Sequence, residues 1–306
     1  MPSVLGTIIE SIIDIMKEME WDGEMYYRGE TKSHYKLVPK LLRNSDEYVN
    51  SIFLRENEIY CRTIVMAEKE APVGASSWQT LALFQHYQLP TRLLDWSSSL
   101  ITAIMFAIEP CLECKKTLCA TSEKCSKKDY SPRIWILIPR LMHSNLHQKT
   151  SLEKLFAVTI GVDDNKIQDY LSIFVQNKNQ ESKWKYKNGP IFLEIPWNNP
   201  RIRAQKGFFT FHANATPLED VPGSYKWLTR IEISRDLILT LKKEISLIGA
   251  NEFDIYPDIS NLAKYFDRQH TRKSAINETM VTDKTAKRTK SSISSGTVIP
   301  TREQKI

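Results

Sequence analysis

Four cysteines crowd one short, lysine-rich stretch of the sequence: Cys111, Cys114, Cys119 and Cys125. Their spacing, C-x2-C-x4-C-x5-C, offers four thiolates to one metal ion, so a tetrahedral zinc site is one hypothesis. A reduced loop without metal and a redox or iron–sulfur role remain open beside it. No basic, cleavable leader is recognisable at the amino terminus, from which we expect reduced thiols and a cytoplasmic location.

Polar residues also interrupt apolar surroundings in three other segments. These are Tyr27-Arg28-Gly29, Gln85 to Ser97 (QHYQLPTRLLDWS) and Arg201 to Phe209 (RIRAQKGFF). Because an unpaired buried charge is very costly, arginines in such places either bind a ligand or pair with acids. One interpretation is therefore structural: Arg28, Arg92 and Asp95 form an ion network that ties core segments together.

Periodicity predicts the elements that must position these residues. Short aromatic or β-branched runs predict strands at 24–29, 93–96, 133–138, 191–195, 207–212 and 227–233. Apolar residues at helical spacing predict helices at 48–70, 77–87, 100–107 and 236–244. The run at 133–138 is almost continuously apolar, so we expect a central strand there. The serines before residue 100 suit a helix N-cap.

The domain organisation follows from pattern and charge. Residues 1–19 predict an amphipathic helix packed on the body, and no run is long enough to span a bilayer. Residues 20–267 predict a single domain with a cysteine-rich insertion at 110–131. Residues 268–306, rich in Ser, Thr and Lys, predict a disordered tail.

The net charge of +6 is unevenly placed. The tail from residue 268 holds nine Lys or Arg and three acids, which leaves 33 of the 42 basic and 33 of the 36 acidic residues in the rest. A neutral body argues against a protein whose main surface coats nucleic acid. The tail itself has two interpretations, a solvated segment or a contact with phosphates.

The polar segments together resemble the FRG family, named for an aromatic-Arg-Gly motif. The family order is an aromatic-Arg-Gly strand, a QH(Y/H)G-x-PTRLLDWT-like segment, an R-x-x-x-Q-x-G-x-F segment, and a closing G…(F/Y)PD. This sequence matches with Tyr27-Arg28-Gly29, residues 90–97, residues 201–209, and Gly249 with Tyr256-Pro257-Asp258. The resemblance spans roughly residues 20 to 265. Gln88 stands where the family usually has glycine, and Ser97 replaces threonine.

The motif order is also similar to that of the ADP-ribosyltransferase superfamily. This resemblance implies an α+β fold in which a central mixed or antiparallel sheet is split around a ligand cleft and flanked by helices. It implies an NAD cleft with Arg28 at the first catalytic position, Ser97 at the second and Gln205 at the third. Asp95 is the nearest carboxylate that could replace the glutamate usual at the third position.

The resemblance also implies which residues hold the nicotinamide nucleotide: Tyr27, Arg28, Gly29, Arg92, Ser97 and Ser98. A guanidinium can grip a pyrophosphate with two hydrogen bonds, and a hydroxyl at a helix N-terminus can hold a ribose. Simpler interpretations stay open. In these, the serines only cap a helix, and Gln205 is a satisfied core amide.

Two functions are consistent with these residues, and a third is open. The first is an NAD-dependent enzyme that transfers ADP-ribose to a macromolecular acceptor, protein or nucleic acid, as a toxin or phage-defence effector. The second is an inactive module that binds a nucleotide or nucleic acid. The third is a protein-interaction partner within a defence operon. No membrane partner is expected.

Overall fold

The computed structural model describes residues 3–43, 49–66, 77–109, 130–148, 153–161, 189–197, 199–212, 214–263 and 265–267. The chain forms two compact units, residues 1–257 and residues 258–306. In the second unit a helical segment follows Asp258, whose carboxylate accepts a hydrogen bond from the backbone N–H of Asn261 at 2.9 Å. The tail from residue 268 and the cysteine-rich residues 110–129 lie outside the described residues.

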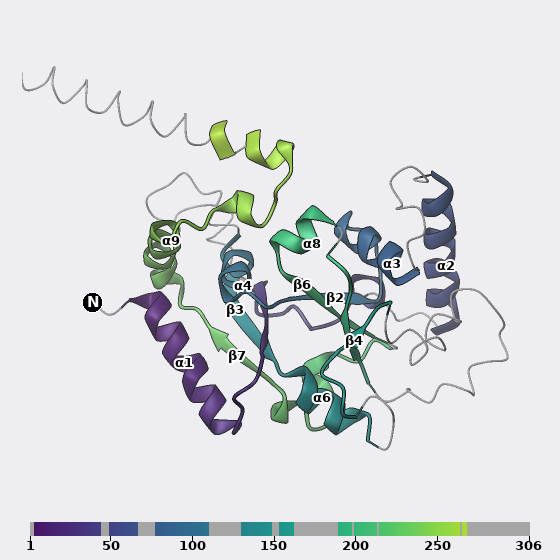
Figure 1. Cartoon of the computed structure of the whole chain (residues 1–306), viewed down its shortest axis with the longest axis horizontal. Coiled ribbons are helices and arrows are strands. Elements are labelled where there is room, and N and C mark those ends of the chain that lie inside the picture. Colours follow the sequence, from purple (N-terminus) through teal and green to yellow (C-terminus); the bar gives the residue numbers. More distant parts are fainter. Residues whose placement is uncertain are drawn as a thin grey trace, which may run out of the picture. The chain divides into compact units, whose positions relative to one another are not determined.

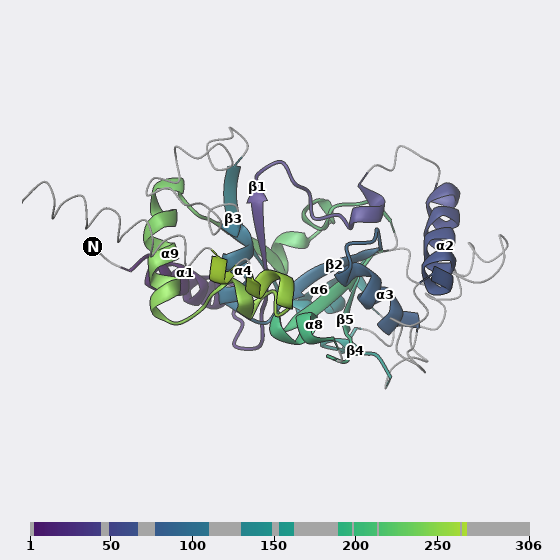
Figure 2. The same ribbon diagram turned by 90° about the horizontal axis from the view of Figure 1, so that it is seen from above.

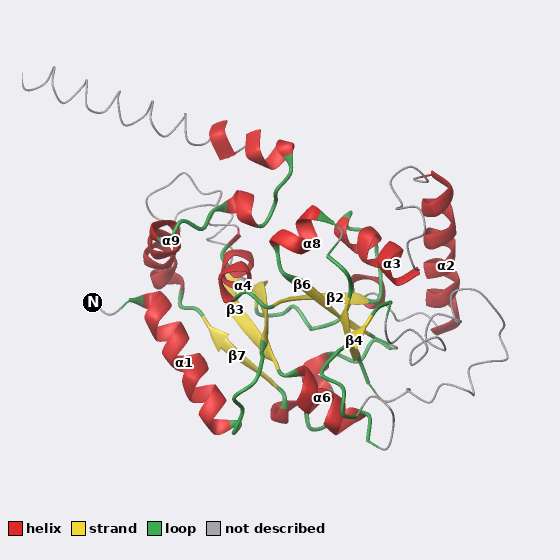
Figure 3. Cartoon of the chain, viewed as in Figure 1, coloured by secondary structure: helices red, strands yellow, loops and turns green. Residues whose placement is uncertain are grey.

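The first unit combines helices with one sheet (Figures 1 and 3). Its helices are α1 (Val4–Glu18), α2 (Val49–Met66), α3 (Ser77–His86), α4 (Leu100–Ala107), α6 (Pro139–Leu146), α8 (Pro200–Ala204) and α9 (Ile238–Leu247). Its strands are β1 (Tyr26–Lys32), β2 (Leu93–Ser97), β3 (Tyr130–Leu137), β4 (Val158–Thr159), β5 (Ile191–Glu194), β6 (Gly207–Phe211) and β7 (Leu228–Glu232). Short 3-10 turns lie at Lys40–Leu42, Leu218–Asp220, Ser224–Lys226, Arg235–Leu237 and Glu252–Asp254.

The described strands form a single mixed sheet in the order β4-β5-β6-β2-β1-β3-β7. Only β4 and β5 are parallel among these pairs. The α+β class and the mixed sheet predicted from the sequence are thus confirmed.

One joint of this sheet is weak. Strands β1 and β2 pair at one position, Tyr27 with Ser97, whereas β1 and β3 pair from Tyr26 to Lys32. The two strands run apart from that joint (Figure 2). The sheet is therefore continuous, but it opens between β1 and β2.

Strand β3 is buried on both faces, as its apolar run predicts. Ile134 and Ile136 pack with α1, α4 and α9 on one side, while Trp135 and Leu137 pack in a second cluster on the other. Helix α4 crosses the first face directly over β1. A Cβ atom on Gly29 would lie 1.9 Å from the carbonyl oxygen of Ala103. The glycine of the aromatic-Arg-Gly motif is therefore a packing requirement.

Helix α1 packs on the body through Val4, Ile8 and Ile12, which are buried at helical spacing. Its first turn is capped by Glu244 of α9, whose carboxylate accepts hydrogen bonds from the N–H groups of Val4 and Leu5 at 3.0 and 2.7 Å. An acidic side chain suits this place because free N–H groups and the helix dipole favour negative charge there.

Among the α-helices and strands that the structure describes, sequence periodicity missed α6, α8 and β4. Helices α6 and α8 each begin with a proline at their first turn and are short, so neither shows a full amphipathic repeat. Strand β4 has two residues, too few for any alternation. Among the described residues, no helix is long and apolar enough to cross a membrane.

Helix α3 ends in a turn that requires a left-handed residue. The N–H of Leu89 donates to the carbonyl of Phe84 and that of Gln88 to the carbonyl of Gln85, the two bonds of a Schellman motif. Gln88 has φ 64°, a conformation that glycine adopts at little cost. The turn is thus kept although the usual glycine is absent.

Replacing Gln88 by glycine is expected to stabilise the protein by about 0.5–1 kcal/mol. The gain is smaller than the full strain because glycine also increases the freedom of the unfolded chain. Urea unfolding monitored by circular dichroism measures the change. A destabilised Gln88→Gly variant would contradict the strain argument.

A buried histidine on α6 anchors β5. The Nε2 atom of His143 accepts the backbone N–H of Phe192 at 2.9 Å, so Nδ1 carries the proton and donates to the carbonyl of Leu155 at 3.0 Å. Burial lowers the pKa of His143 to about 4. The Nε2 atom of His212 lies 3.0 Å from the hydroxyl oxygen of Thr210. Burial, and to a smaller extent the positive charge of Arg28, lower the pKa of His212 to about 3.

Because of these two histidines, we expect the free energy of unfolding to decrease at acidic pH. Both bind protons more weakly in the folded than in the unfolded state, so the stability is complete above about pH 6.5 and falls as the pH drops toward 4. Each histidine contributes a slope of up to about 1.4 kcal/mol per pH unit. Unfolding free energies measured from pH 7 to 4 should show this loss, and His212→Gln should make the slope shallower.

Candidate functional site

A pocket of about 320 Å³ opens where β1 and β2 separate. Its walls include Tyr27, Arg28 and Gly29 of β1 and all of β2, with further residues from α3, α8 and β6. This volume lies within the range of small-ligand sites. The pocket therefore joins the three polar segments singled out in the sequence.

The charge of this pocket is predominantly positive. Among its lining residues, Arg28, Lys40, Arg43 and Arg201 are cationic, and Asp95 is the one carboxylate. Burial and the neighbouring Arg28 lower the pKa of Arg43, as expected when two guanidinium groups share a partly dry space. Such a pocket favours an anionic ligand, because an anion would offset both repulsion and desolvation.

Arg28 bridges the opening between the two strands. Its Nη1 donates to the backbone carbonyl of Asp95 at 2.8 Å, and its Nε lies 3.6 Å from a carboxylate oxygen of Glu30. The side chain remains 17% exposed. Toward the described residues, it uses only one of its five N–H donors in a hydrogen bond. The guanidinium can therefore accept an anionic ligand while it holds β2.

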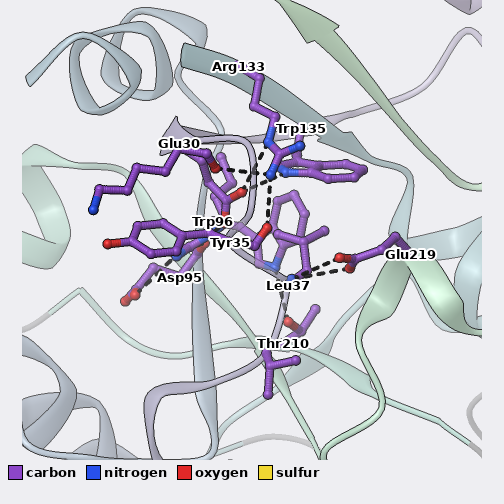
Figure 4. Close-up of polar contacts among 12 residues, drawn as sticks. Glu30, Tyr35, Leu37, Asp95, Trp96, Arg133, Trp135, Thr210 and Glu219 are labelled. Carbon is purple, nitrogen blue, oxygen red and sulfur yellow. Dashed lines mark hydrogen bonds and ion pairs between the residues drawn. The ribbon is translucent and has the colours of Figure 1, made fainter. Parts of the chain in front are cut away.

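Glu30 forms an ion pair with Arg28 at 3.6 Å, and Figure 4 shows the same carboxylate in contact with Arg133 and Trp135. Its buried carboxylate accepts a hydrogen bond from Nε1 of Trp135 at 3.0 Å and lies 3.4 Å from Nε of Arg133. Arg133 in turn donates to the carbonyls of Lys32, Ser33 and Tyr35, at 3.1, 2.6 and 2.9 Å. Two arginines thus share one buried acid, so Arg28 does belong to an ion network, but its members are Glu30 and Arg133 and not the predicted Arg92.

Asp95 lies on the opposite wall with a half-exposed side chain. Its Oδ2 accepts a hydrogen bond from Nε2 of Gln85 at 2.7 Å and lies 3.8 Å from Nη1 of Arg28. Gln85 accepts, through Oε1, the hydroxyl proton of Thr91 at 2.5 Å. The pocket carboxylate is thus held by a second residue of the same motif.

Arg92 is not brought to the pocket. It is fully buried, its Nε lies 2.6 Å from Glu56 of α2, and its guanidinium stacks 4.5 Å from the ring centre of Phe211. Burial raises the pKa of Glu56, and the adjacent guanidinium acts in the opposite direction. The structure therefore places Arg92 in a separate buried ion pair, away from Arg28 and Asp95.

The serines at the start of α4 have structural partners. The hydroxyl of Ser97 donates to the carbonyl of Gln205 at 2.6 Å and accepts the N–H of Ser99 at 2.9 Å. Ser99 caps α4 by accepting the N–H of Thr102. Ser97 lines the pocket, whereas the exposed Ser98 does not.

Gln205 lines the pocket at the end of α8. Its Nε2 donates to the carbonyl of Ile255 at 2.9 Å, which ties the third motif to the closing one. There, Tyr256 donates its hydroxyl to Glu109 at 2.6 Å, and the guanidinium of Arg201 stacks 4.4 Å from the Tyr256 ring. The closing motif therefore supports the pocket wall and orients Arg201.

Cys111, Cys114, Cys119 and Cys125 lie outside the described residues. Within the part of the chain that is described, no group of three or more His, Cys, Asp or Glu side chains could hold a metal ion.

Sequence reasoning assigned no role to several residues that build the site. Arg201 and Gln85 lie within the polar segments 201–209 and 85–97, so the sequence did contain a signal for them. Lys40 and Arg43 carry no such signal, because a 3-10 turn outside every motif brings them to the pocket.

Comparison with known proteins identifies part of the chain. Residues 23–115 match the family model of the FRG domain. This range includes β1, α3, β2 and α4, and hence the first two motifs. No curated protein and no solved structure matches the chain. The third motif lies beyond the matched range, but its strand β6 pairs with β2 from Gly207 to Phe211.

Proposed function

We propose, from the premise that this chain carries an FRG domain, that its pocket binds NAD and transfers ADP-ribose to a macromolecular acceptor. The observation that carries the proposal is the pocket between β1 and β2, where four cationic side chains face one half-exposed carboxylate. The position of this pocket, beside the joint at which β1 and β2 pair through Tyr27 and Ser97 alone, also supports the proposal.

The cations suit the pyrophosphate of NAD. Arginine binds phosphate oxygens through paired, charge-assisted hydrogen bonds, and Arg28 is partly exposed and paired with Glu30. Arg43 and Lys40 extend the positive wall along the same pocket. Binding in this pocket would therefore orient the dinucleotide by its phosphates.

Asp95 suits the reacting end of the ligand. In the transfer, the C–N bond to nicotinamide breaks, nicotinamide leaves with the bonding electrons, and an acceptor nucleophile bonds to the same ribose carbon and loses its proton. Positive charge builds on the ribose between these events, and a nearby carboxylate stabilises it. Asp95 is the carboxylate among the pocket-lining residues, and Gln205 can orient a ribose hydroxyl through its amide oxygen.

Labelled NAD incubated with a cell lysate tests the proposal. The wild-type protein should transfer label to macromolecules, and Arg28→Ala should reduce transfer by at least about tenfold through loss of a charge-assisted contact. Arg140→Ala is the matched control, because Arg140 is exposed on α6 and does not line the pocket. Melting curves should normalise each variant for folded protein.

Absence of label with the wild type, together with absence of NAD binding by calorimetry, would overturn the proposal. A large loss of stability in Arg28→Ala, with transfer unchanged per folded molecule, would assign Arg28 to structure alone. An NAD-consuming activity of this kind would fit a toxin or a phage-defence effector.

The second candidate is a nucleotide-binding or nucleic-acid-binding module without catalysis. It is favoured by the partners of Ser97 and Gln205, whose polar groups already bind backbone. In that case ADP-ribose or RNA would bind to the pocket, and no label would be transferred from NAD to macromolecules. Binding dominated by phosphate contacts should also weaken steeply with salt.

A further inference from the structure

The contacts of the second motif fix the direction of every hydrogen bond around Asp95. The backbone N–H of Leu93 can only donate, and it donates to the hydroxyl oxygen of Thr91 at 3.1 Å. The Thr91 hydroxyl donates to Oε1 of Gln85, 2.5 Å away. Nε2 of Gln85 consequently faces Asp95 as a donor, and a flipped amide would set two acceptors against each other.

The Asp95 carboxylate forms a hydrogen bond with Gln85 but only a long ion pair with Arg28. The Gln85 amide lies 2.7 Å from Oδ2, within hydrogen-bond distance, whereas Nη1 of Arg28 lies 3.8 Å away from the same oxygen, beyond it. Nη1 of Arg28 instead donates a hydrogen bond to the backbone carbonyl of Asp95 at 2.8 Å. The Asp95 side chain is half exposed, so solvent leaves it room to change its rotamer.

We infer that Gln85 is a positioning residue that keeps Asp95 from forming a close, hydrogen-bonded ion pair with Arg28, and that it thereby sets the affinity of the pocket for anionic ligands. The inference rests on the proposed function, since it assumes that Arg28 binds the phosphates of the ligand. An internal carboxylate and an incoming phosphate compete for the same guanidinium. Gln85 biases this competition toward the ligand by giving Asp95 another donor.

Calorimetric titration with ADP-ribose and with inorganic pyrophosphate tests the inference. Four proteins are compared: wild type, Gln85→Met, Asp95→Asn, and the double variant. Methionine matches the length of glutamine and has no donor, so Asp95 should turn to Arg28 and affinity should fall about tenfold. Asp95→Asn should bind at least as tightly as the wild type.

The double variant separates positioning from direct contact. If Gln85 acts through Asp95, Gln85→Met should have no effect once Asp95 is neutral, so the double variant should bind like Asp95→Asn. If Gln85 touches the ligand itself, the double variant should lose affinity by the same factor as the single one. That result would overturn the inference, as would equal affinity of Gln85→Met and wild type.

Failure of the inference differs from failure of the proposed function. A wild type that binds neither probe would overturn both, whereas a wild type that binds, with Gln85→Met unchanged, overturns only the inference. Melting temperatures report the stability of each variant. If Gln85 has a merely structural role, Gln85→Met should lower the melting temperature by the same amount with and without the Asp95→Asn substitution. Should Gln85→Met fail to fold, Gln85→Asn carries the same expectation, because its shorter side chain cannot bridge Thr91 and Asp95.

Discussion

Gly29→Ala is expected to prevent stable folding, with a loss of at least about 3 kcal/mol. The added Cβ would lie 1.9 Å from the carbonyl oxygen of Ala103 and 2.5 Å from the backbone nitrogen of Ala107, both in α4. These are backbone atoms, so no side-chain rotation relieves the clash. Helix α4 would have to lift from β1, which exposes its buried residues to water.

Expression level, circular dichroism and chemical unfolding measure this effect. Gly6→Ala is the matched control, since Gly6 lies in α1 and an added Cβ would meet only Ser3, at 3.4 Å. Alanine there should stabilise the helix by about 0.5–1 kcal/mol. A Gly29→Ala variant as stable as the wild type would show that α4 does not press on β1.

Arg92→Met is expected to cost about 3–5 kcal/mol, because it leaves the carboxylate of Glu56 buried without its partner. Both side chains are almost completely buried, 0% and 3% exposed. A buried charge without a counter-charge is costly, whereas replacing both charges by apolar groups of similar size is often neutral or stabilising. The double variant Glu56→Leu, Arg92→Met should therefore recover most of the loss.

Denaturant unfolding of the two single variants and the double variant measures the coupling. Binding of ADP-ribose per folded molecule should be unchanged in the double variant, because Arg92 does not line the pocket. Loss of ADP-ribose binding in a fully folded double variant would show that Arg92 contributes to the ligand site. Single variants that are as stable as the wild type would show that α2 does not depend on this pair.

Much of the fold could be predicted because its elements carry their own local signals. The continuous apolar run of β3 predicts burial on both faces, and Ile134 and Trp135 indeed pack on opposite sides. The serines before α4 predict a helix start, and Ser99 is the cap. The predicted helix at 236–244 begins with a 3-10 turn, and its α-helical part, α9, runs later, from Ile238 to Leu247.

The site could be predicted only in part, because side-chain partners come from distant segments. Arg28, Asp95 and Arg92 looked alike as charges within apolar runs. The structure separates them: Arg28 and Asp95 meet across the joint between β1 and β2, and Arg92 meets Glu56 instead. Arg92 lies just before β2 and is buried against Phe211, whereas Asp95 lies within β2 and is half exposed.

By itself, the sequence determined the FRG domain, the α+β class and the segments that line the pocket, because motifs and periodicity are local properties of the chain. Only the tertiary structure decided which polar groups remain available for a ligand. The hydroxyl of Ser97 and the guanidinium of Arg92 are engaged within the protein, while Lys40 and Arg43 join the pocket from outside every motif. Pairing between distant residues depends on packing geometry, which residue spacing along the chain does not encode.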